Sequence, residues 1–259
     1  MNQGINKLCI FLLLMLTFFS CTNDTEETCC ELTEEEIFIN EEAEIKEHLE
    51  NIQIDDTLGP LLEKAGLVDV QSLQPRIRVD LKYASEDNFM GFNMYGGLDK
   101  AYLQPEVAQR LANVQDYLDE NHPHLRLYVF DAVRPLSVQQ MMWDALDSIP
   151  VNERIKFISN PRNGSIHNYG AAVDLTLFNT ITDTLLDMGA GYDDLRKIAY
   201  PKYEDSFLEK GLLTHEQVEN RKLLRYAMRK GGFWVIPSEW WHFNAFTRDE
   251  AKEKFKQIK

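Results

Sequence analysis

The sequence predicts an α+β fold, in which a small antiparallel sheet is packed by helices. In some segments apolar residues recur with the period of a helix, and in others they alternate with polar residues as in a strand. The two kinds of segment follow one another irregularly, without the strict βαβ alternation that builds a parallel sheet. This order favours an antiparallel sheet covered by helices.

Five segments are predicted strands. Residues 76–81 alternate apolar and polar side chains, which is typical of a strand with one buried face. The other predicted strands are rich in aliphatic and aromatic residues and comprise residues 125–133, 171–177, 233–236 and 240–246.

Three predicted helices lie between these strands, over residues 105–121, 137–146 and 214–230. Pro105 suits the first turn of the first helix, which carries an apolar stripe at helical spacing. Ser137 is expected to cap the second helix. Thr214 and Gln217 have the spacing of a capping box at the start of the third helix, and Gly231 is expected to end it.

The 259-residue chain has a formal charge of −15, which lies almost entirely in one N-terminal segment. Residues 22–56 hold 14 acidic residues and one lysine, whereas residues 57–259 hold 28 acidic and 25 basic residues. We therefore interpret residues 21–57 as an acidic tether and residues 58–259 as one folded domain. Because this domain is nearly neutral, it lacks the basic surface that nucleic-acid binding requires, and no nucleic-acid partner is expected.

Residues 1–20 have the features of a bacterial export signal. Lys7 precedes a mostly apolar run of 12 residues, which is too short to span a membrane comfortably. Ser20 and Cys21 follow, and this ending resembles the lipobox of bacterial lipoproteins, although Phe18 stands where leucine is usual. The resemblance implies cleavage before Cys21, a lipid on its sulfur that attaches the chain to a membrane, and a location in the periplasm or on the cell surface. The alternative is an ordinary signal peptide or an uncleaved anchor.

Two short segments carry side chains that suit a metal-dependent hydrolase. One supplies His167 and Asp174, and the other supplies Glu239 and His242. A hydrolytic zinc site takes three nitrogen or oxygen ligands from the protein and leaves a fourth position for water, whose pKa the metal lowers. His167, Asp174 and His242 would complete such a set around one Zn²⁺, and Glu239 would be the general base.

Strand geometry sets conditions on this site. Alternation along a strand places Asp174 with the small Ala172, on the face opposite the neighbouring valine and leucine side chains. Glu239 and His242 are three residues apart, which on a regular strand would place them on opposite faces. We therefore expect Glu239 to precede the strand, with the backbone turned toward the site, and His242 to share a face with Asn244.

Two competing motifs are set aside. Residues 215–219 begin like the H-E-x-x-H zinc motif, but a glutamate stands at the fifth position. Ser165, His167 and Asp174 offer the residue types of a serine triad, but a histidine that binds zinc cannot be the base for a serine. All four cysteines lie within the first 30 residues, so the folded domain has no cysteine nucleophile.

The first segment has the pattern S-x-H-x-x-G-x-A-x-D, and the second reads E-W-W-H. Together they resemble the zinc D-alanyl-D-alanine dipeptidases of the VanX type, and the resemblance extends over most of residues 76–246. Further matches in the same order are Lys82-Tyr83-Ala84, Asp87-Asn88-Phe89, Gly91, Asp131 with Arg134-Pro135, and Met188-Gly189 with Asp193. The resemblance implies the fold of this family, Zn²⁺ on His167, Asp174 and His242, and Glu239 as catalytic base. It also implies hydrolysis of a small D,D-dipeptide, D-alanyl-D-alanine, to two D-alanines in cell-wall metabolism.

The resemblance assigns roles to four further residues. It implies that Arg134 stabilises the oxyanion formed as water attacks, whereas without it a surface salt bridge with Asp131 is the simpler interpretation. It places Tyr83 and Asp193 near the substrate amine, although alone they would be a core aromatic residue and the cap of a helix that starts near residue 194. Ser165 is expected to contact substrate or to order the loop that carries His167.

Two other functions stay open at this point. A D,D-carboxypeptidase that trims peptidoglycan stem peptides would use the same metal centre with a longer pocket. A non-catalytic wall-binding lipoprotein would keep the fold without turnover, although the presence of Glu239 argues against it. No protein partner is predicted.

Overall fold

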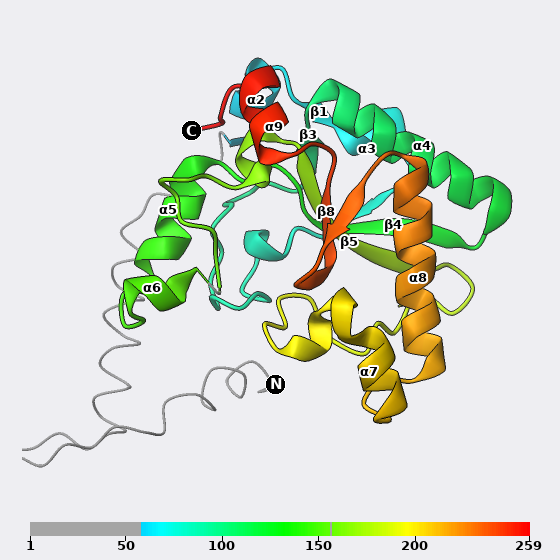
Figure 1. The fold of residues 1–259 in the computed structure, drawn as a ribbon. Helices are drawn as coiled ribbons and strands as arrows, with labels where there is room; N and C mark the ends of the chain where they lie inside the picture. The colour runs from blue at the N-terminus through cyan, green and yellow to red at the C-terminus, as the bar shows by residue number, and fades with distance from the viewer. Residues whose placement is uncertain (1–57, 156) are drawn as a thin grey trace, which may run out of the picture. The chain divides into compact units, whose positions relative to one another are not determined.

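A computed structural model describes residues 58–155 and 157–259, and the signal peptide and tether predicted for residues 1–20 and 21–57 lie outside them. The described chain forms a six-stranded sheet in the order β2-β4-β5-β8-β7, with β6 paired to β5, and a separate pair of β1 and β3 (Figure 1). The strands are β1 (Val68–Asp69), β2 (Arg78–Val79), β3 (Tyr102–Leu103), β4 (Leu125–Asp131), β5 (Ala172–Asn179), β6 (Thr184–Leu185), β7 (Trp234–Ile236) and β8 (Glu239–Asn244). The predicted α+β class is confirmed.

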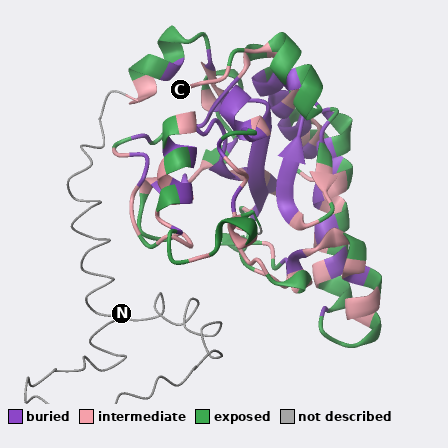
Figure 2. Cartoon of the chain, turned by 60° about the vertical axis from the view of Figure 1, so that its left-hand side comes forward, coloured by how far each residue is buried: buried purple, intermediate pink, exposed green. Residues whose placement is uncertain are grey.

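The helices surround the strands, and Figure 2 shows the buried residues concentrated in the central strands, with the exposed residues on the helices around them. The α-helices are α2 (Leu58–Lys64), α3 (Val70–Leu73), α4 (Pro105–Asn121), α5 (Leu136–Asp144), α6 (Val151–Arg154), α7 (Glu204–Glu209), α8 (His215–Lys230) and α9 (Arg248–Lys254). Single turns of 3₁₀-helix are η1 (Lys82–Ala84), η2 (Ile166–Tyr169), η3 (Lys197–Ala199) and η4 (Pro201–Tyr203). Within the described residues, none of these helices combines the length and the apolar character needed to cross a membrane.

The two long helices follow their sequence signals closely. α4 has the predicted bounds, and its apolar stripe, which includes Leu111, is fully buried. Thr214 and Gln217 make the predicted capping box at the start of α8, because each side chain accepts a hydrogen bond from the backbone N–H of the other. At the other end of α8, a Cβ on Gly231 would overlap the Val114 side chain of α4. The end of α8 therefore needs glycine in order to approach α4 this closely.

One predicted strand and one predicted helix differ from the structure in pairing or capping. The strand expected over residues 76–81 is reduced to β2, and it pairs with β4 in parallel rather than antiparallel. The chain between β2 and β4 includes α4, which provides the crossover that a parallel pair needs. α5 begins one residue before Ser137, with Pro135 at the cap position, so Ser137 does not cap it. The Leu136 N–H that starts this helix donates instead to the carbonyl of Ile258.

The register of the three central strands brings polar residues side by side. Asp174 of β5 lies opposite Asp131 of β4 on one side and opposite His242 of β8 on the other. Both neighbouring pairings are antiparallel. The end of β4, the start of β5 and the middle of β8 therefore meet at one place, where the candidate site lies.

Candidate metal centre

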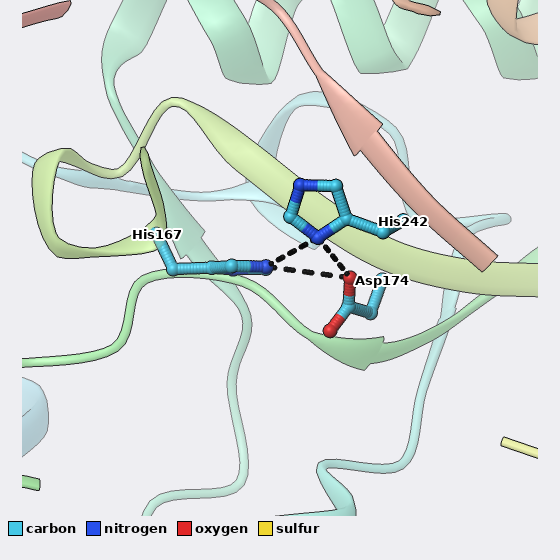
Figure 3. Close-up of side chains that lie close together, drawn as sticks. All are labelled: His167, Asp174 and His242. Carbon is cyan, nitrogen blue, oxygen red and sulfur yellow. Dashed lines mark hydrogen bonds and ion pairs between the residues drawn. The ribbon is translucent and has the colours of Figure 1, made fainter. Parts of the chain in front are cut away.

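His167, Asp174 and His242 gather their ligand atoms within 4.8 Å of one another (Figure 3). His167 Nε2 lies 3.1 Å from His242 Nδ1 and 3.3 Å from Asp174 Oδ1, and His242 Nδ1 lies 2.9 Å from Asp174 Oδ1. All three residues are buried. Strand pairing places Asp174 and His242, whereas His167 reaches the cluster from the turn η2.

The loop that carries His167 is held by its own hydrogen bonds. The Ser165 hydroxyl accepts a hydrogen bond from the His167 N–H, and Asn168 Oδ1 accepts one from the Ser165 N–H at 2.6 Å. Gly170 then ends the turn at φ 62, a left-handed conformation that favours glycine. Ser165 therefore orders this loop, which is one of the two roles expected for it. The His167 ring contacts Ala132 and His242 rather than the Ser165 hydroxyl in the described chain.

In each imidazole, the nitrogen that faces away from Asp174 contacts a hydrogen-bond acceptor. His167 Nδ1 lies 2.6 Å from the carbonyl oxygen of Ala132, and His242 Nε2 lies 2.8 Å from Asn244 Oδ1. Because both partners accept, each of these ring nitrogens carries the proton. In the neutral form of each ring, the nitrogen that faces Asp174 therefore carries the lone pair, and this is the form that can ligate a metal.

The Asp174 carboxylate divides its two oxygens between different partners. Oδ2 accepts a hydrogen bond from the Tyr192 hydroxyl at 3.2 Å, whereas Oδ1 is buried without a hydrogen bond and faces the two imidazoles. Three electron-pair donors thus point at one another, and buried polar atoms of this kind need a partner. Two imidazole nitrogens and one carboxylate oxygen are a donor set that suits zinc. The residues fit the metal that the sequence predicts.

The pKa values of Asp174 and His242 show that this cluster favours a positive charge beside the Asp174 carboxylate. Burial alone would raise the pKa of Asp174, but the two imidazoles hold it far below its usual range. Burial alone would lower the pKa of His242, but the Asp174 carboxylate, 2.9 Å from its Nδ1, raises it to about 9.

Glu239 lies beside the cluster without joining it. Its Oε2 is 3.9 Å from His242 Nδ1, and its side chain is 33% exposed, whereas that of Asp174 is 4% exposed. Glu239 is the first residue of β8 rather than a residue before the strand, so that expectation was wrong. The β7–β8 register shifts between Val235 and Ile236, and Glu239 pairs with Ile236. This irregularity allows Glu239 and His242 to approach on one side. Burial raises the pKa of the Glu239 carboxyl, and His242 opposes that rise.

Arg134 and Asp131 form the salt bridge considered as the alternative, but it is buried, so its expected place on the surface is wrong. Asp131 is fully buried, and Arg134 is 7% exposed. Nε and Nη2 of Arg134 donate to Asp131 Oδ2 at 3.0 and 2.6 Å. Nη2 also lies 3.9 Å from Asp174 Oδ2, which places the guanidinium next to the metal cluster. Burial alone would lower the pKa of Arg134, but Asp131 keeps it well above the usual value, so the group is a fixed cation.

Tyr83 and Asp193 meet although 110 residues separate them in the chain. The Tyr83 hydroxyl donates to Asp193 Oδ2 at 3.1 Å, and the rest of the Tyr83 side chain is buried in the core. No helix begins at residue 194 in the described chain, since the next one, η3, is capped by Arg196; the helix-cap interpretation of Asp193 is therefore wrong. Burial, followed by the charge of Asp174, raises the pKa of Asp193 well above its usual value. A cationic partner would stabilise the Asp193 carboxylate.

The loop of His167 and the turn of Arg134 are joined by a small hydrogen-bond network. The Arg134 N–H donates to the His167 carbonyl at 3.1 Å, and Asn168 Nδ2 donates to the Arg134 carbonyl at 2.7 Å. Near the C-terminus, the Ile258 N–H donates to the Asn168 carbonyl, and the Leu136 N–H donates to the Ile258 carbonyl, both at 2.8 Å. These hydrogen bonds link the two loops to each other and to the C-terminal segment.

Several residues of the site were not predicted. Tyr192, which bonds Asp174, and Tyr95, whose hydroxyl donates to Asp131 at 2.6 Å, belong to no motif that was recognised. Asn244 was expected on the same strand face as His242. Because the two residues are two positions apart, the sequence could have indicated the contact between Asn244 and the His242 imidazole. The rejected residues 215–219 lie at the start of α8, where His215 and Glu216 are exposed.

Comparisons with known proteins agree with this geometry. A profile of the family described as D-ala-D-ala dipeptidase (Peptidase M15) matches residues 63–258. The D-alanyl-D-alanine dipeptidase of Escherichia coli (strain K12) is 33% identical over 177 residues, which cover 68% of this chain and 83% of that protein. The enzyme of the same name from Enterococcus faecium is 29% identical over 198 residues, 71% of this chain and 93% of that protein. A third, from Synechocystis sp., is 29% identical over 177 residues, 58% of this chain and 71% of that protein. The family match includes every residue of the metal cluster and Glu239, and the chain belongs to the D-ala-D-ala dipeptidase family of metallopeptidases.

Proposed function

We propose that this chain is a zinc-dependent dipeptidase of bacterial cell-wall metabolism that hydrolyses D-alanyl-D-alanine to two D-alanines. The observation that carries the proposal is the meeting of three buried electron-pair donors, on His167, Asp174 and His242, with the Glu239 carboxylate beside them. The names of its relatives support the dipeptide as substrate.

His167, Asp174 and His242 would hold one Zn²⁺, which when bound lowers the pKa of water and polarises the substrate carbonyl. Glu239 is partly exposed beside these ligands and would take the proton from the attacking water, then return it to the leaving amine. Arg134 would stabilise the negative charge that develops on the carbonyl oxygen, because Asp131 holds its guanidinium rigidly next to the site.

Recognition of a dipeptide requires groups for its free amine. The Asp193 carboxylate accepts a hydrogen bond from the Tyr83 hydroxyl and would pair with the substrate ammonium. An anion of raised pKa gains most from a cationic partner, and a longer peptide would have no ammonium at this position.

The outer-shell partner of His242 provides a first prediction. Asn244→Leu is expected to weaken Zn²⁺ binding about 10- to 100-fold, because the ring loses the acceptor that orients it and holds its proton on Nε2. Competition for Zn²⁺ with a chelating dye measures the change. Asn113→Leu on the exposed side of α4 is the control and should bind like the wild type. Equal affinity for Asn244→Leu would contradict the role given to Asn244.

The proposal as a whole is tested with the purified protein. We expect one Zn²⁺ per chain and hydrolysis of D-Ala-D-Ala, with little or no turnover of a pentapeptide that ends in D-Ala-D-Ala. Preference for the pentapeptide would show a D,D-carboxypeptidase instead. Binding of the peptides without turnover, at saturating Zn²⁺, would show a non-catalytic wall-binding protein.

We also propose that the chain is exported and attached to a membrane through a lipid on Cys21, in the periplasm or on the cell surface. The export signal over residues 1–20 and the small residue before Cys21 support this location. Fractionation of cells should find the wild type in the membrane fraction and Cys21→Ser released from it. Equal release of both proteins would contradict the lipid anchor.

A further inference from the structure

One face of α8 contacts the segment of residues 187–198, which carries Tyr192 and Asp193. Figure 1 shows α7, which follows this segment, beside α8. Gln217 Nε2 and Asn220 Nδ2 donate to the side chain and the carbonyl of Asp187, at 2.8 and 2.9 Å. These contacts fix the start of the segment on the helix.

Arg221 lies one helical turn after Gln217 and is fully buried. It makes hydrogen bonds to the segment at two separate points. Its Nε donates to the Met188 carbonyl at 2.6 Å, and its Nη1 and Nη2 both donate to the Ile198 carbonyl at 3.1 Å. These carbonyls lie on opposite sides of Tyr192 and Asp193 in the sequence. A single planar guanidinium therefore joins both ends of the loop that presents the two residues to the site.

Glu204 balances the buried charge. Its Oε1 lies 3.5 Å from Arg221 Nη1, and Arg225 donates to both of its carboxylate oxygens, at 2.8 and 2.6 Å. A buried guanidinium is costly unless its N–H groups and its charge are satisfied, and here they are. The mechanism derived above makes no use of this cluster, so its contacts require another explanation.

The loop that Arg221 closes is held in an uncommon shape. Asp193 has φ 58, a left-handed conformation that non-glycine residues adopt only when their surroundings enforce it. Where the loop faces the site, the Asp193 carboxylate accepts a hydrogen bond from the Tyr83 hydroxyl, and the Tyr192 hydroxyl donates one to Asp174. The loop is thus held at its ends by Arg221 and at its centre by the site.

We propose that Arg221 is a positioning residue for substrate-amine recognition: by joining Met188 to Ile198 it sets the distance between Asp193 and the metal centre. This inference rests on the proposed function, because it needs Asp193 to pair with the substrate ammonium. Arg221 touches neither the substrate position nor the metal ligands, and it acts through the backbone of residues 188–198.

Arg221→Lys tests the inference, because lysine keeps the charge but cannot span both carbonyls. We expect KM for D-Ala-D-Ala to rise about tenfold or more, since small displacements of a binding group have large effects, while kcat per bound Zn²⁺ changes little. A variant that only lost stability would lower the active fraction without raising KM. Lys222→Met, at the next and exposed position of α8, is the control and should keep the wild-type KM.

A double-mutant cycle separates this role from a general one. In an Asp193→Asn background, where the ammonium partner is already lost, Arg221→Lys should raise KM little further. An equal rise in both backgrounds would overturn the proposal, as would an unchanged KM in Arg221→Lys alone. Should Arg221→Lys fail to fold, Asn220→Ala removes a partly exposed contact of the same loop and must raise KM in the same way. A wild type inactive on D-Ala-D-Ala would instead refute the proposed function itself.

Discussion

Glu239→Gln is expected to bind Zn²⁺ like the wild type and to hydrolyse D-Ala-D-Ala about 10²- to 10⁴-fold more slowly, which is the usual contribution of a general base. The side chain keeps its size and its place in β8 but can no longer accept a proton. Its Oε2 lies 3.9 Å from His242 Nδ1 and beside, rather than among, the three ligand atoms, so metal binding does not require it.

The measurement is kcat together with Zn²⁺ content determined on the same sample. Glu216→Gln is the matched control: Glu216 is an exposed residue in the first turn of α8 and belongs to the motif that only begins like H-E-x-x-H. It should leave both quantities unchanged. Zn²⁺ lost from Glu239→Gln would make Glu239 a ligand, and full activity would exclude it as the base.

Arg134→Lys is expected to lower kcat about 10²- to 10³-fold with little change in KM, which is typical of the loss of one oxyanion donor. The charge at the oxygen develops only in the transition state, so the ground-state complex loses little. Lysine preserves a cation next to the buried Asp131, whereas alanine would leave that carboxylate unpaired and destabilise the fold. What lysine cannot reproduce is the pair of N–H groups that direct the guanidinium toward the site.

Thermal unfolding and Zn²⁺ content should show that Arg134→Lys is folded and loaded before its kcat is interpreted. Arg76→Lys is the control for the substitution, because Arg76 is 49% exposed and pairs with Asp119, and neither residue belongs to the site. If kcat of Arg134→Lys stays within a few fold of the wild type, the Arg134–Asp131 pair is structural and another group stabilises the oxyanion.

Local signals in the sequence were sufficient for the long helices. The bounds of α4 follow from Pro105 and an apolar stripe, and the start of α8 follows from the capping box of Thr214 and Gln217. These features act over a few neighbouring residues, so nothing distant is needed to recognise them. The motif residues of the metal centre were also recognisable, because their types and spacing limit the chemistry that they can perform.

The remaining features depend on contacts between distant parts of the chain. The parallel pairing of β2, the register shift that turns Glu239 toward His242, and the Ile258 contacts that join the two site loops have no local signature. The same holds for the acceptors that fix the imidazole protons and for the Arg221 contacts with Met188 and Ile198. Residue types and their spacing specify which groups a site contains. Their distances and protonation depend on strand register and buried hydrogen bonds, which arise only when segments far apart in sequence pack together.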